Sequence, residues 1–180
     1  FKSRAVRTDS VLVRFGRDLE LPVVAAAWYQ LGNAYKKSGQ HGEAVKAYQQ
    51  VVDITGVIED FRSLVQFQIA ETRFLQKEYT EAAEEYKKYV RLFPNSEVAG
   101  KAFFYSGWSE FNLKEYETAI ATLQEMLEKY PEDRYAPDAQ FRIASAHYEM
   151  GMYELAIDKA QGVLNNFPSS PVIAQATYLK

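Results

Sequence analysis

The chain has 180 residues, a net charge of −3 and no cysteine. This length fits one domain or one extended array, and the mildly acidic balance gives no sign of the strongly basic face that binds nucleic acid. Without cysteine there is neither a disulfide framework nor a thiolate metal site, and no apolar run approaches the roughly 18 residues of a membrane-spanning helix. We therefore expect no nucleic-acid partner and no direct membrane span.

Residues 1–21 have the weakest pattern in the chain. Their apolar residues are spaced as on one face of a helix: Ala5, Val6, Val11, Leu12 and Phe15. We interpret this stretch as the second helix of an upstream repeat followed by a linker, with a solvated charged face rather than a phosphate-binding patch. Because the chain begins at Phe1 and not at Met, we expect its natural start, with any targeting segment, to lie upstream.

Three later segments repeat one another: EYTEAAEEYKKYVRLFPNS from residue 78, EYETAIATLQEMLEKYPED from 115 and MYELAIDKAQGVLNNFPSS from 152. Their equivalent alanines, Ala82, Ala119 and Ala156, are 37 residues apart. Apolar residues after each alanine follow helical spacing on a single face. A proline near the end of each segment stops the helix, because proline lacks an amide donor and disfavours helical geometry in the residue before it.

A second helical pattern precedes each of these segments, and the earliest copy of the pair starts near residue 22. It reads AAAWYQLGNAYKKSGQ from residue 25 and HGEAVKAYQQVVDITG from residue 41. A small residue recurs in the first helix, where it lets two helices approach closely: Gly32, Ala70, Gly107 and Ala144. Neither helix can bury its apolar stripe alone, so the units must stack. The sequence predicts units over 22–58, 59–96, 97–133 and 134–170, then the first helix of a further repeat or a capping helix over 171–180.

The first unit carries the residues that identify the repeat: Trp28, Leu31, Gly32, Tyr35, Gly39, Ala44 and Tyr48. They match the signature of the tetratricopeptide repeat nearly position for position. The 37-residue period and the closing motifs FPNS, YPED and FPSS resemble a bacterial branch of that family, which includes the Tol-Pal cell-division coordinator and the outer-membrane assembly lipoprotein. The resemblance covers about residues 22–180. It implies an all-α, right-handed α-solenoid superhelix of antiparallel helix pairs, with about ten helices.

The sequence offers no catalytic constellation. His41 and His147 are its only histidines and are far apart, so we interpret both as repeat filler or surface residues rather than as ligands or bases. No glycine-rich phosphate loop occurs, and acidic pairs such as Glu84–Glu85 fit a solvated helix face better than a catalytic cleft. We predict no enzyme activity, no cofactor and no metal.

What remains is a surface for binding. The resemblance implies that the first helix of each unit lines the concave groove of the superhelix, through positions two, five, nine, twelve and thirteen of the unit. Carried over residue by residue, these positions predict the following groove residues: Tyr29, Asn33, Lys36, Phe67, Glu71, Phe74, Lys101, Phe104, Trp108, Phe111, Phe141, Ser145 and Tyr148. For the aromatic members the alternative is packing in the core. Trp108 has no aromatic equivalent in the other units, which favours a role in binding.

One groove function of the family is the capture of a peptide's C-terminal carboxylate by a clamp of lysine, asparagine and arginine residues. Only Asn33 and Lys101 match the clamp, whereas Tyr29, Gln68 and Tyr105 stand at its other three positions. We therefore expect no carboxylate clamp. An aromatic and polar groove suits an extended or helical partner segment instead.

The leading hypothesis is a non-catalytic scaffold that binds a protein or peptide partner. The resemblance favours the bacterial periplasm or cell envelope, with the cytoplasm as the alternative. Two other functions stay open: a regulatory or targeting arm of a multidomain enzyme, and a repeat array that self-assembles into homo-oligomers through its uncapped ends.

Overall fold

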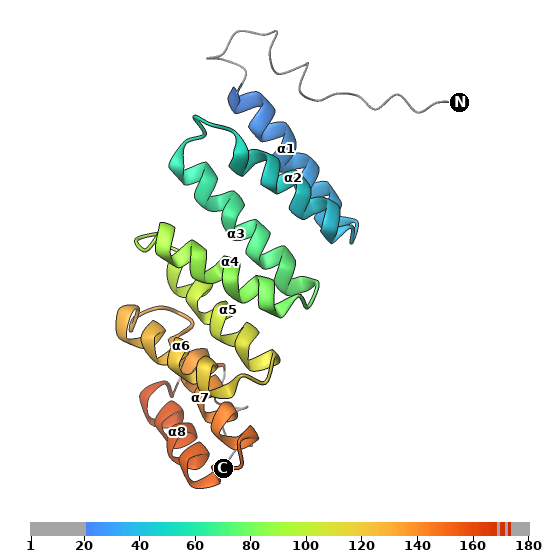
Figure 1. Ribbon diagram of the computed structural model, residues 1–180. Helices are drawn as coiled ribbons and strands as arrows, with labels where there is room; N and C mark the ends of the chain where they lie inside the picture. The colour runs from blue at the N-terminus through green and yellow to red at the C-terminus, as the bar shows by residue number, and fades with distance from the viewer. Residues whose placement is uncertain (1–20, 169, 172, 174–180) are drawn as a thin grey trace, which may run out of the picture. The chain divides into compact units, whose positions relative to one another are not determined.

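The computed structural model describes residues 21–168, 170, 171 and 173, and the secondary structure of this part is helical (Figure 1). Short turns join its eight α-helices into pairs: α1 (Leu21–Lys37) with α2 (His41–Asp53), α3 (Glu59–Leu75) with α4 (Tyr79–Leu92), α5 (Ala99–Asn112) with α6 (Tyr116–Lys129), and α7 (Ala136–Glu149) with α8 (Tyr153–Asn166). The predicted all-α array of helix pairs is confirmed.

Two further helices were expected at the ends of the chain. The one within residues 1–21 lies outside the described residues, as does most of the one expected from residue 171. Among the helices that are described, none is long and apolar enough to cross a membrane. The boundaries drawn between repeat units stay a prediction.

The turn within each pair has one residue in left-handed backbone geometry at the same place. This residue is Gly39 (φ 78°), Lys77 (φ 62°), Lys114 (φ 64°) or Gly151 (φ 74°). Glycine adopts this geometry without a steric penalty, whereas a lysine side chain crowds the neighbouring carbonyl. Every pair therefore keeps the tight turn, and in the two middle pairs the lysine makes its backbone conformation less favourable.

The proline after the second helix ends it as predicted. α4, α6 and α8 each stop two residues before the proline. The residue directly before the proline still donates a hydrogen bond into the last turn, as the amide of Phe93 does to the carbonyl of Tyr89 at 2.8 Å. The helix thus ends where the next amide donor is missing.

The chain divides into two compact units, residues 1–65 and 66–180, and α3 runs across the division. In the first unit, α1 packs on α2. Tyr48 of α2 is fully buried, and a Cβ atom on Gly32 of α1 would lie only 2.5 Å from its ring. The Tyr48 hydroxyl donates a hydrogen bond of 2.7 Å to Asn33 Oδ1. Glycine in the signature therefore makes room for the signature tyrosine.

In the second unit, each helix from α4 to α7 packs on the next one along the chain. The adjoining part of α3 packs on α4 through Phe67, whose ring centroid lies 5.8 Å from that of Tyr86 and 5.5 Å from that of Tyr89. α5 also contacts α7, so these first helices of successive pairs are neighbours. One core runs through the unit and includes Phe67, Tyr86, Tyr89, Phe103, Phe104, Leu123, Met126 and Ile143.

The three similar segments of the sequence form α4, α6 and α8. Their alanines, Ala82, Ala119 and Ala156, are completely buried. The tyrosine that begins each helix packs edge-on against an aromatic ring of the preceding helix, with centroids 5.3–5.5 Å apart: Tyr79 on Phe74, Tyr116 on Phe111, and Tyr153 on Tyr148. The segments recur because each pair needs the same internal packing.

Candidate functional site

Three predicted groove residues lie on α1, in the first unit. Tyr29 is half-buried, and its ring centroid lies 5.9 Å from that of Tyr48 and 5.4 Å from that of Phe61. Asn33 accepts the hydrogen bond of the Tyr48 hydroxyl. Lys36 is half-buried three residues further on. Tyr29 and Asn33 thus contact the core of this unit and are also partly exposed at its surface.

Phe67 and Phe104 lie in the core of the second unit, with exposed fractions of 5% and 2%. Both stand at position five of the repeat unit, where the sequence left open whether the aromatic residue faces the groove or packs in the core. For these two residues the structure shows core packing. The ring of Phe104 packs against Tyr105 and Trp108, at centroid distances of 5.4 and 5.6 Å. These phenylalanines therefore support the surface from beneath rather than form it.

Five half-buried rings of the second unit form what we call the aromatic face: Phe74, Tyr105, Trp108, Phe111 and Tyr135. They come from α3, α5 and the residue before α7. The Phe74 centroid lies 5.1 Å from Tyr105 and 5.2 Å from Trp108, and Tyr105 lies 5.4 Å from Trp108 and 6.0 Å from Tyr135. The sequence predicted three of these rings as groove residues and missed Tyr105 and Tyr135.

A lysine and a glutamate predicted as groove residues meet beside the aromatic face. Lys101 Nζ lies 3.3 Å from Glu71 Oε1, and also 4.7 Å from the ring centroid of Phe67. Burial raises the pKa of the Tyr105 hydroxyl, and the neighbouring Tyr135 and Glu71 raise it further. This hydroxyl is therefore neutral at physiological pH.

Arg142, on α7, is a cation of this site that the sequence-based prediction missed. Its guanidinium carbon lies 4.7 Å from the ring centroid of Trp108 and 5.0 Å from that of Phe111. Burial lowers the pKa of the guanidinium, while Asp138 raises it. A signal was present in the sequence, because Arg142 directly follows the predicted Phe141, just as Tyr105 follows Phe104.

The last predicted groove residues lie on α7, the first helix of the fourth pair. Phe141 is half-buried and packs beside Val163 of α8. Ser145 donates a hydrogen bond of 3.0 Å to the carbonyl of Phe141 within its own helix, so its hydroxyl is already engaged. Tyr148 is 46% exposed and packs on Tyr153. Among the residues that the sequence predicted, the structure thus brings together Glu71, Phe74, Lys101, Trp108 and Phe111.

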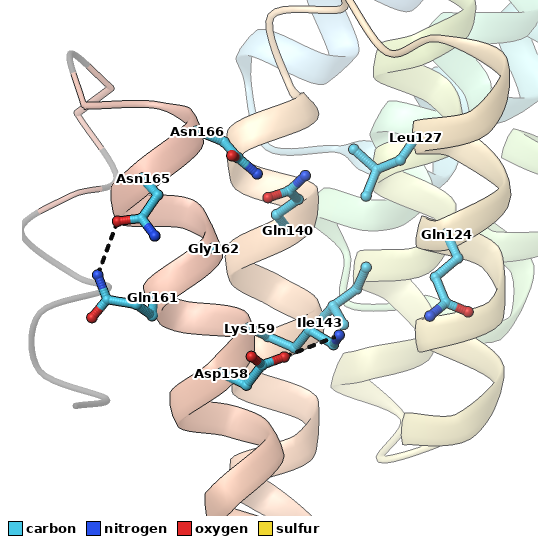
Figure 2. Close-up of a pocket in the computed structure, with 10 residues that line it drawn as sticks. All are labelled: Gln124, Leu127, Gln140, Ile143, Asp158, Lys159, Gln161, Gly162, Asn165 and Asn166. Atoms are coloured by element: carbon cyan, nitrogen blue, oxygen red, sulfur yellow. Dashed lines mark hydrogen bonds and ion pairs between the residues drawn. The ribbon is translucent and has the colours of Figure 1, made fainter.

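Apart from the aromatic face, a cleft lies between α6, α7 and α8, and Figure 2 shows the side chains around it. Its volume is about 400 Å³, and its lining is mainly uncharged and polar, with amide side chains such as Gln124, Gln140 and Asn166. Gly162 of α8 leaves one wall open, since a Cβ atom there would meet nothing within 4 Å. Its only aliphatic lining residues are Leu127 and Ile143, so this cleft, which we call the amide cleft, lacks the aromatic anchors of the aromatic face.

The two histidines lie in different units of the structure. Burial lowers the pKa of His147, and Lys159 lowers it further, so its imidazole is neutral at pH 7. His41 begins α2 in the other unit. Across the described residues, no three histidine or acidic side chains gather closely enough to hold a metal ion.

Three family models match parts of this sequence. Two of them describe the tetratricopeptide repeat and match residues 25–54 and 64–96. The third describes an outer membrane lipoprotein and matches residues 96–180. A search of curated protein sequences found no match.

Solved structures share the fold. The apo form of RapI superposes with a TM-score of 0.71 at 17% identity, over 86% of this chain and 45% of that one. MamA from Desulfovibrio magneticus RS-1 gives 0.62 at 17% identity, over 81% and 77%. Aspartyl phosphate phosphatase F from Bacillus subtilis gives 0.70 at 17% identity, over 96% and 47%. The chain thus spans less than half the length of RapI and of the phosphatase, and identities this low show a common fold alone.

The fold defines the class of protein as an α-helical repeat array, in which each helix pair gains its stability by packing on its neighbours. Repeat models match in two successive helix pairs, so residues 25–54 and 64–96 carry tetratricopeptide repeats. The outer membrane lipoprotein match over the last helix pairs agrees with the bacterial branch that the closing proline motifs resemble.

Proposed function

We propose that this chain is a non-catalytic scaffold that binds a protein or peptide partner on the aromatic face of its second unit. The observation that carries the proposal is the cluster of half-buried rings around Trp108. The other repeat units have no aromatic residue at the position of Trp108. Aromatic residues dominate the binding energy of protein interfaces because they bury a large apolar area at a small entropic cost.

The polar groups around these rings support a partner that is a peptide segment. Lys101 and Glu71 already neutralise each other, so they form a polar border rather than a strongly charged patch. The Tyr105 hydroxyl is neutral and so adds no charge at the centre. An apolar centre with a polar border is the usual anatomy of a protein interface, and an extended or helical segment fits a surface formed by neighbouring helices.

We propose supporting roles for the predicted groove residues that lie outside the aromatic face. Tyr29, Asn33 and Lys36 offer a smaller surface patch within the first unit. Tyr148 offers an exposed ring near the end of α7. Phe67 and Phe104 act indirectly, by holding Lys101 and Trp108 in place.

We further propose that the parent protein works in the bacterial periplasm or cell envelope. The match of residues 96–180 to the outer membrane lipoprotein model supports this location. Fractionation of the source cells with an antibody against this chain tests it: recovery in the envelope fraction is expected, and recovery in the cytoplasm would favour the alternative location.

Photo-crosslinking tests the binding site. A photoreactive phenylalanine analogue replaces Trp108 in one variant and Gln124, which lines the amide cleft, in a matched control. We expect a discrete crosslinked partner from the first variant and none from the second. Equal crosslinking from both, or none from either in source cells that make the protein, would contradict the assignment of the site.

A further inference from the structure

Arg142 lies against the aromatic face and has no ion-pair partner in the described part of the chain. Among the described residues, no carboxylate lies within 4.0 Å of its guanidinium, and its buried Nε has no hydrogen-bond acceptor. Arg73, in contrast, pairs with Glu78, and Arg62 donates to the carbonyl of Ile54 at 3.3 Å. A charge that is partly removed from water without a partner is costly, so its presence here needs a reason.

The surroundings of Arg142 fix its orientation. The guanidinium lies over the rings of Trp108 and Phe111, which hold it by cation–π contact. Asp138, one turn earlier on α7, raises the pKa of the guanidinium through its charge but is not close enough for an ion pair. A planar guanidinium held against aromatic rings keeps its edge free for an acceptor with two oxygens, which is the geometry of a carboxylate.

We propose that Arg142 binds the carboxylate of an aspartate or glutamate side chain in a partner segment that lies on the aromatic face. This inference rests on the proposed function, since it names the chemistry that the same face recognises. A side-chain carboxylate suits the site around Arg142 better than the C-terminal carboxylate of a partner does. Lys101 is already paired with Glu71, and Tyr105 stands beside it in place of a second free cation. The partner is therefore an apolar or aromatic segment with one acidic side chain.

A library of short random peptides with amidated C-termini tests this inference. Peptides selected on the wild-type chain are each made in two forms, with the acid or with its amide (Asp to Asn, Glu to Gln), and their affinities are measured for wild type and for Arg142→Gln. We expect selected peptides to be rich in acids, and the acid form to bind wild type about ten- to a hundredfold more tightly than the amide form. Arg142→Gln should remove that preference while binding the amide form as wild type does.

Three controls separate this inference from simpler explanations. Arg134→Gln removes the same charge from an exposed arginine beside Tyr135 and should change the affinity less than twofold. Arg142→Lys keeps the charge and should restore part of the acid preference; it also decides the question if Arg142→Gln loses its helical circular dichroism. A parallel library with free C-termini should give the same acid preference, with no requirement for the free terminus.

Several outcomes would overturn the inference. Equal losses for acid and amide forms in Arg142→Gln would make Arg142 only a support for Trp108. An equal effect of Arg134→Gln would show a general effect of charge, and dependence on a free C-terminus would assign the carboxylate to the chain end. Peptides that need Trp108 but show no acid preference would refute this inference and leave the proposed function standing. A library that yields no binder would refute both.

Discussion

Two glycines in the middle of helices provide a sharp test of the packing between first and second helices. Gly107 lies on α5, and a Cβ atom there would come within 2.6 Å of Leu123 Cγ on α6. Gly162 lies on α8, where a Cβ atom would meet nothing within 4 Å. The perturbation is the same in both cases, a single methyl group from glycine to alanine, and only the surroundings differ.

The expected magnitudes follow from these surroundings. Alanine in the middle of a helix is more stable than glycine by about 0.5–1 kcal/mol, so Gly162→Ala should raise the free energy of unfolding by about that amount. Gly107→Ala receives the same gain but forces Leu123, which is fully buried, out of its place. Overpacking of this kind costs about 1–3 kcal/mol. Both variants gain the same helix propensity, so the difference between their free energies of unfolding equals the steric cost at Gly107.

Urea unfolding followed by far-ultraviolet circular dichroism measures both variants. We expect Gly107→Ala to be less stable than Gly162→Ala by about 1–3 kcal/mol. In the double variant Gly107→Ala with Leu123→Ala, the cost of the leucine change should be smaller than in the wild-type background, because the new methyl group part-fills the cavity. Equal stabilities for the two single variants would refute the close approach of α5 and α6.

Two further substitutions test local features of the fold. Lys114→Gly should stabilise the chain by about 0.5–1 kcal/mol in urea unfolding, because lysine is held there at φ 64°. Glycine in place of the exposed helical Thr118, the control, should destabilise the chain. A loss of stability from Lys114→Gly would contradict the left-handed turn. Tyr86→Phe should raise stability by about 1 kcal/mol at pH 7, since the buried Tyr86 hydroxyl has no hydrogen-bond partner among the described residues. Burial also raises the pKa of Tyr86 above its unfolded value of 10.0, so wild-type stability should fall as the pH rises above about 10, when the unfolded state ionises first. An alkaline loss as large in Tyr86→Phe as in wild type would assign it to other groups.

The period of the sequence was enough to predict the helix pairs. Three recurring residues show why: Ala119 is buried, Tyr116 packs on Phe111 across the turn, and α6 ends shortly before Pro131. Each of these roles needs a particular residue type, which recurs in the sequence. The helices expected at the two ends of the chain are not tested, because they fall outside the described residues.

The surface residues were harder to predict, for a geometric reason. Phe104 and Tyr105 are adjacent aromatic residues on α5, so their side chains point about 100° apart around the helix. Periodicity places both near the boundary between the core and the surface, and the packing of α4, α6 and α7 decides that Phe104 is buried while Tyr105 is partly exposed. Sequence reasoning chose the first of the two.

Arg142 was missed because its role depends on another helix. Its contacts with Trp108 and Phe111 join α7 to α5, which lie more than 20 residues apart in the sequence. No local pattern in the sequence states that these helices are neighbours. The family resemblance named the helices of the groove, but the charge and ring contacts within it come from the packing of this chain alone.

The affinity of the selected library peptides for Trp108→Ala shows whether the aromatic face holds the partner. We expect this variant, with helicity unchanged, to lose about thirtyfold or more in affinity, because an aromatic anchor at the centre of an interface carries much of the binding energy. Gln124→Ala in the amide cleft should bind as wild type does. Binding by Trp108→Ala that equals wild type, or an equal loss from Gln124→Ala, would contradict the claim that the aromatic face holds the partner.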